Sequence, residues 1–112
     1  FYNCISLATA PELPATKLAN YCYRNMFYGC ESLTTAPELS ATTLTNYCYA
    51  SMFWRCTSLN YIKCMATDIS ATDCVDDWVY DVASSGTFVK DTNTYWPSGT
   101  SGIPDNWTVI NQ

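Results

Sequence analysis

The chain repeats itself with a period of 26 residues, and this period constrains its fold more than any other feature. Cysteine recurs at this spacing in two series, Cys4–Cys30–Cys56 and Cys22–Cys48–Cys74. Residues 4–29 and 30–55 are identical at 17 of 26 aligned positions. A unit of this length cannot bury its apolar face alone, so neighbouring units must stack and share one core.

Each unit combines an extended pattern with a helical one. The Ala-Pro pairs at 10–11 and 36–37 disfavour helix for the residue before proline, which predicts extended chain there. Leu44, Cys48 and Met52 recur at i, i+4 and i+8, which is typical of one face of a helix. Extended segments are expected at 7–12, 33–38, 59–64 and 85–90, with a last strand at 107–110.

This alternation predicts an α/β solenoid. A period of 26 lies in the range of roughly 20–29 residues of leucine-rich repeats, so we expect a right-handed β/α superhelix of that type. The repeat array spans 1–74 and begins inside a unit, which suggests that further units precede it. Residues 75–112 are rich in Gly, Pro and Trp and are expected to form a C-terminal cap over the last core layer of the same domain.

The unit C-x-S-L-x-x-A-P-E-L-x-A-T-x-L-x-x-Y-C-Y-x-x-M-F, read from Cys4–Phe27 and Cys30–Phe53, resembles the BspA-like leucine-rich repeats of bacterial surface proteins. These are abundant in gut and oral Bacteroidetes. The tail, including Gly102-Ile103-Pro104-Asp105-Asn106-Trp107, is also similar to the C-terminal end of such arrays. The resemblance implies a secreted or surface-anchored, non-enzymatic protein, and some family members bind host matrix proteins or other bacteria.

Composition excludes several classes of partner. Five basic against ten acidic residues give a net charge of −5, which argues against binding a phosphate backbone. No apolar run approaches the roughly 18 residues of a membrane span. The resemblance to surface proteins implies a location outside the cell or on its surface, with any signal or anchor outside this segment, and we expect a monomer.

Seven cysteines and no histidine limit the chemistry of the chain. Without a base beside a cysteine, and without the usual zinc spacings, neither a catalytic nucleophile nor a metal site is expected. Two alternatives remain for the cysteines. In the first, the cysteines are buried thiols. In the second, some of them form disulfides, either between residues 18 positions apart, such as Cys4 and Cys22, or between Cys64 and Cys74.

Acidic and aromatic residues each allow a functional and a structural interpretation. Five carboxylates lie between Asp68 and Asp81, and they form either a calcium site or a solvated face.

Tyrosines and tryptophans recur in register, for example at Tyr28 and Trp54. They form either a contact platform or packing between layers, and the regular register favours packing.

The predicted sheet offers the candidate binding surface. If Ala36 and Ile62 point inward, alternation turns their neighbours outward. The candidate binding residues are Thr9, Thr35, Tyr61, Lys63 and Thr87. We expect a non-enzymatic binding module without a cofactor, adhesin-like, for a protein or glycan. The alternative is a structural spacer and cap of a longer surface protein, without a ligand of its own.

Overall fold

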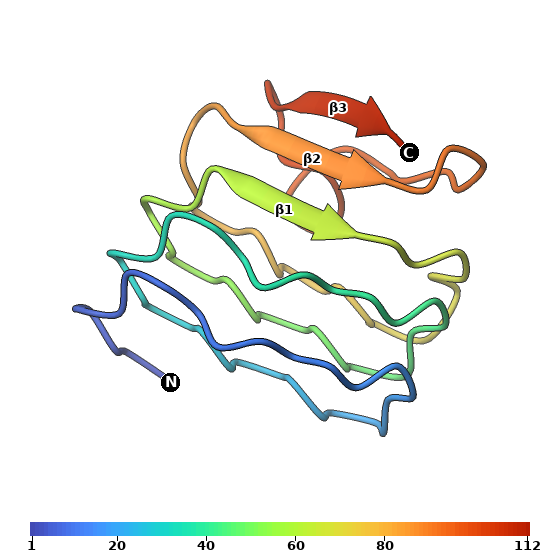
Figure 1. The fold of residues 1–112 in the computed structure, drawn as a ribbon, viewed down its shortest axis with the longest axis horizontal. Helices are drawn as coiled ribbons and strands as arrows, with labels where there is room; N and C mark the ends of the chain where they lie inside the picture. Colours follow the sequence, from blue (N-terminus) through green and yellow to red (C-terminus); the bar gives the residue numbers. More distant parts are fainter.

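The regular structure of the chain is one parallel sheet of short strands. A computed structural model describes residues 1–112. Strands β1 (Tyr61–Cys64), β2 (Thr87–Lys90) and β3 (Thr108–Asn111) lie in the order β1-β2-β3 (Figure 1). Both strand pairs are parallel. The three strands coincide with the extended segments expected at 59–64, 85–90 and 107–110, within a few residues.

Toward the N-terminus the sheet is reduced to single bridges. Thr9 pairs with Thr35, and Thr35 pairs with Tyr61, both in the parallel sense. Pro11 and Pro37 follow two residues later, and a proline cannot donate an N–H to a ladder. The segments 7–12 and 33–38 therefore follow the path of the sheet without becoming strands.

The segments predicted as helical form successive tight turns, and the structure contains no helix. We call 20–29, 46–55 and 72–81 the turn segments. Alternate residues donate their N–H groups within the segment, as Met52 does to the carbonyl oxygen of Tyr49 at 3.0 Å. The residues between them donate to the next segment, as Phe53 does to the carbonyl oxygen of Trp78 at 2.9 Å.

Backbone conformation explains why these segments are not helices. Every fourth residue of a turn segment has a positive φ, which a right-handed helix does not allow. In the second segment these residues are Tyr47 (57°), Ser51 (51°) and Arg55 (58°). The same positions recur at Tyr21, Asn25 and Gly29, and at Asp73, Asp77 and Asp81. A turn repeated every four residues buries Leu44, Cys48 and Met52, just as a helix would. For this reason their spacing resembles the apolar face of a helix.

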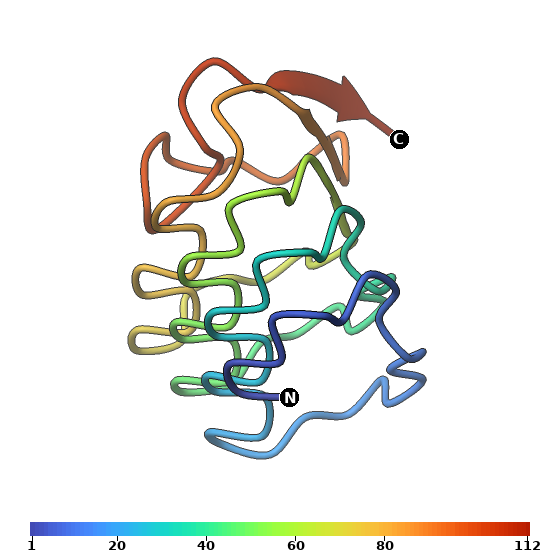
Figure 2. The ribbon, with the colours of Figure 1, turned by 90° about the vertical axis from the view of Figure 1, so that its left-hand side faces the viewer.

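The prediction of a leucine-rich-repeat-like α/β solenoid is therefore wrong. The molecule is a small globule of 34 × 29 × 21 Å with three parallel strands in one sheet, not a β/α superhelix. Residues one unit apart nevertheless lie side by side, and successive passes of the chain follow one another from the N-terminus to β3 (Figure 2). Sheet and turn segments enclose a core of 23 buried residues, among them Phe53, Leu59 and Trp78.

The segment 97–103 covers the last turn segment. The N–H of Val79 donates to the carbonyl oxygen of Thr100 at 3.2 Å, and the N–H of Asp77 donates to the Ser101 hydroxyl at 2.9 Å. The indole N–H of Trp78 donates to the carbonyl oxygen of Gly102 at 2.8 Å. A side chain at Gly102 would collide with the Pro97 carbonyl group, so glycine is needed for this close approach. The structure has no helix that could span a membrane.

Candidate functional site

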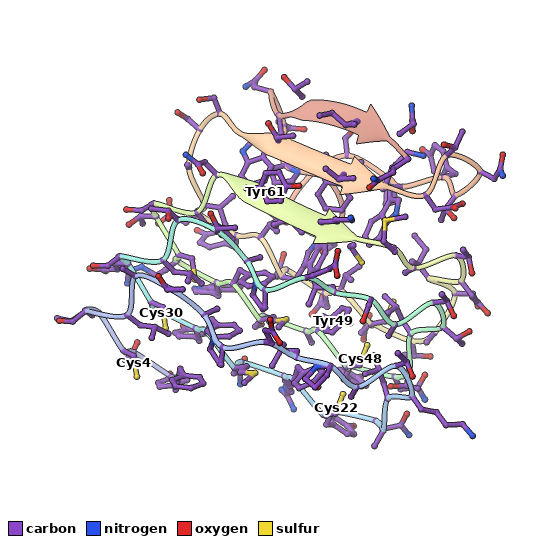
Figure 3. The ribbon with its side chains drawn as sticks, viewed as in Figure 1. Cys4, Cys22, Cys30, Cys48, Tyr49 and Tyr61 are labelled. Atoms are coloured by element: carbon purple, nitrogen blue, oxygen red, sulfur yellow. The ribbon has the colours of Figure 1, made fainter.

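Four of the five predicted binding residues lie along one line on the outer face of the sheet. Thr9, Thr35 and Tyr61 follow one another through parallel bridges, and Tyr61 pairs with Thr87 in the strand register. Their inward neighbours Ala36, Ile62 and Phe88 are buried, as alternation requires. We call the outward line the sheet-face column; it consists of Thr9, Thr35, Tyr61, Thr87 and Thr108. Tyr61 stands at the start of β1 (Figure 3).

Lys63 lies beside this column and is held by an ion pair. Its ammonium group is 3.0 Å from the Glu38 carboxylate of the neighbouring unit. The Lys63 side chain is 27% exposed, so a ligand on the sheet face would meet a fixed cation whose charge is already paired. Glu38 also borders a groove of about 290 Å³, together with residues that include Pro11, Pro14 and Pro37.

Two residues of this surface were not expected from the sequence. Thr108 extends the column on β3, but it lies 21 residues after Thr87 because the last connection is shorter, so counting by 26 misses it. Glu38 lies in a segment for which the sequence predicts only extended chain, and its ion pair with Lys63 depends on the register between the two units. Val89 follows Lys63 by 26 residues but is buried, so the exposed surface beside the column is interrupted there. It resumes at Ile110, which pairs with Val89 in the strand register and is exposed.

All seven cysteines are free thiols, so neither the pairs 18 residues apart nor Cys64 and Cys74 form a disulfide. Cys4 and Cys30 lie at one end of the turn segments and Cys22 and Cys48 at the other, so residues 18 apart do not meet (Figure 3). The Cys56 thiol donates to the carbonyl oxygen of Phe27 at 3.0 Å.

Burial makes the core thiols weaker acids than a thiol exposed to water. It raises the pKa of Cys56 and of Cys64 to about 12, and that of Cys74 to about 11. A thiolate is the nucleophilic form, so these buried thiols are inert near neutral pH.

The acidic residues between Asp68 and Asp81 have local structural roles in and next to the last turn segment. Asp73, Asp77 and Asp81 occupy its three positive-φ positions, which Asp and Asn tolerate better than most residues. The Asp68 carboxylate accepts hydrogen bonds from the N–H and hydroxyl of Ser70, and these bonds lower the pKa of Asp68. No three acidic or cysteine side chains lie close enough together to hold a metal ion.

Aromatic residues one unit apart stack on one another, as their register predicted. The outer aromatic column consists of Tyr2, Tyr28, Trp54 and Tyr80. Its ring centroids are separated by 4.7, 5.9 and 4.2 Å in that order. Because each inner ring is covered on both faces by its neighbours, this column presents ring edges to solvent rather than a flat platform.

Comparisons of the chain with models of protein families, with curated proteins and with solved structures find no match.

Proposed function

We propose that this chain is a non-enzymatic binding module of a secreted or cell-surface protein, and that its sheet face contacts a protein or glycan. The observation that carries the proposal is the sheet-face column itself. Residues from five separate parts of the chain, Thr9 to Thr108, are aligned there by parallel pairing. The resemblance of the repeated unit to those of BspA-like surface proteins supports the secreted or surface location.

The chemistry of this face suits a neutral or weakly charged ligand. Threonine hydroxyls both donate and accept hydrogen bonds, and Tyr61 adds an amphipathic ring next to them. The Lys63–Glu38 ion pair supplies one charge of each sign 3.0 Å apart, so it adds no net charge to the face. A ligand that hydrogen-bonds along the column fits this surface better than a strongly anionic one.

A binding screen tests the proposal directly. The folded chain is applied to a glycan array and to a panel of extracellular matrix proteins, beside the double variant Tyr61→Ala/Lys63→Ala. Tyr21→Ala is the matched control, because this tyrosine is 52% exposed and lies in a turn segment rather than on the sheet. Binding that the double variant loses and Tyr21→Ala keeps supports the proposal. Binding to neither panel contradicts it and favours a structural spacer.

A further inference from the structure

A second surface, at the C-terminal end of the molecule, has the features of a small-molecule site. An open cavity of about 540 Å³ lies between β3 and the chain that leads to it, coloured orange to red in Figure 1. We call it the cap cavity. Its volume falls in the range of about 300–1,000 Å³ that small-molecule sites occupy. The residues that matter for its chemistry are Lys90, Asn93, Tyr95, Trp96, Asp105 and Asn106.

Trp96 borders this cavity and carries a buried donor without an acceptor. Its indole N–H is the only buried side-chain nitrogen or oxygen in the structure that has no hydrogen-bond partner. The other two buried tryptophans of this region are anchored, Trp78 to the carbonyl oxygen of Gly102 and Trp107 to that of Ala83, both at 2.8 Å. An unpaired buried donor destabilises a fold, so an acceptor oxygen supplied here by a ligand would be favoured.

The walls of the cavity combine a free aromatic ring with polar groups. Tyr95 is 82% exposed, so its ring remains available to a ligand. One face of Trp96 is covered by Trp78, with ring centroids 5.5 Å apart, which holds this bordering ring in place. Around them, Asn93 and Asn106 offer amide groups and Asp105 offers a carboxylate acceptor.

Charge indicates which class of ligand fits. The Lys90 ammonium donates to the carbonyl oxygens of Asp91 and Thr94, at 2.9 and 2.7 Å, so two of its three donors are already used. The Asp105 carboxylate and the net charge of −5 oppose an anion. A single carboxylate is also a weak site for a cation.

We propose that the cap cavity binds a neutral saccharide of one or two rings. The C–H face of a sugar ring packs on Tyr95, and its hydroxyl groups exchange hydrogen bonds with Asn93, Asn106 and Asp105. One hydroxyl oxygen accepts from the Trp96 indole N–H, which is buried in the unliganded structure, so binding requires the cavity wall to open at this ring. This site is separate from the sheet-face column, so either proposal can fail without the other.

Nuclear magnetic resonance on the intact chain tests this site. The four tryptophan indole N–H signals are assigned by Trp→Phe substitution and followed during titration with neutral methyl glycosides and disaccharides. We expect one neutral sugar to move the Trp96 signal saturably while the signal of Trp54, in the outer aromatic column, stays in place. Tyr95→Ala should raise the Kd about tenfold, the loss expected for one good contact.

Controls separate the site from general surface binding. Tyr21→Ala, another exposed tyrosine, and the sheet-face variant Tyr61→Ala/Lys63→Ala should leave the Kd unchanged. Sialic acid and glucosamine provide an anionic and a cationic arm. The proposal is overturned if no neutral sugar moves the Trp96 signal, if only a charged sugar does, or if Tyr95→Ala binds as well as the unaltered chain.

Discussion

Phe53 lies flat on Phe27, with ring centroids 5.8 Å apart and an interplanar angle of 4°. The two residues are 26 positions apart, and Phe1 continues the stack from Phe27 at 5.7 Å. The contact therefore joins equivalent positions of successive units rather than neighbours in the chain. Stacking of equivalent side chains is what fills the core of this protein, because each unit alone exposes the ring that the next unit covers.

Removing the Phe53 ring should be strongly destabilising. Phe53 is fully buried and also contacts Trp78, so Phe53→Ala leaves a cavity and should cost about 3–5 kcal/mol in the free energy of unfolding. Phe1→Ala is the matched control, because Phe1 is 49% exposed, and it should cost less than about 1 kcal/mol. Urea unfolding followed by circular dichroism measures both. Equal losses would contradict the stacked core.

Thiol accessibility should divide the cysteines into two classes. Cys4 and Cys22 are exposed and the other five are buried. An aromatic disulfide reagent at pH 8 should therefore titrate two thiols quickly in the folded chain, and all seven in denaturant without reductant. Fewer than seven thiols in denaturant would reveal a disulfide that the structure does not contain.

Stability should fall with rising pH in the alkaline range. Burial raises the pKa of Cys56 and Cys64 from 9.0 to about 12, so the unfolded chain loses these protons first. The contribution of these thiols is fully present below pH 9 and is lost between pH 9 and 12, with at most about 1.4 kcal/mol per pH unit for each thiol. Burial raises the pKa of the Tyr49 phenol as well, in the same direction.

The melting temperature as a function of pH measures this effect. Cys56→Ala should flatten the decline above pH 9, whereas Cys4→Ala, which removes an exposed thiol, should not. A decline that is equally steep in both variants would assign the effect to other groups.

The left-handed backbone at Ser51 offers a stabilising substitution. Ser51 has a φ of 51°, and its equivalent in the preceding unit is Asn25, with a φ of 58°. Asparagine tolerates this conformation better than serine, so Ser51→Asn should raise the free energy of unfolding by about 0.5 kcal/mol. Ser51→Val should lower it by about 1–2 kcal/mol, because a β-branched residue is strained there. If both substitutions had the same effect, the backbone at this position would not be left-handed.

The strands of the sheet agree with the sequence pattern, because side-chain alternation decides their structure. The 26-residue spacing placed Tyr61 beside Thr87 and buried Ile62 and Phe88, as the strand register shows. Alternation along a strand has a period of two and leaves little choice once one face is apolar.

The turn segments could not be predicted in the same way. A turn repeated every four residues and a helix of 3.6 residues per turn bury nearly the same positions over two turns, so Leu44, Cys48 and Met52 fit both. What separates them is the positive φ at Tyr47, Ser51 and Arg55, residue types that give no signal for it. In the other two segments the four-residue spacing of Asn25 and Gly29, and of the three aspartates, did offer such a signal. The unpaired Trp96 N–H also has no sequence signal, because it depends on which carbonyl groups lie near the ring.

Hydrogen-bond scalar couplings test the central structural claim most directly, since the sheet-face column depends on the register between units. In isotope-labelled protein, we expect couplings from the Tyr49 nitrogen to the Cys74 carbonyl carbon and from the Phe53 nitrogen to that of Trp78. These correspond to N–H to oxygen contacts of 2.9 Å. Couplings from Phe53 to Tyr49, four residues earlier, would instead show a helix and contradict this account.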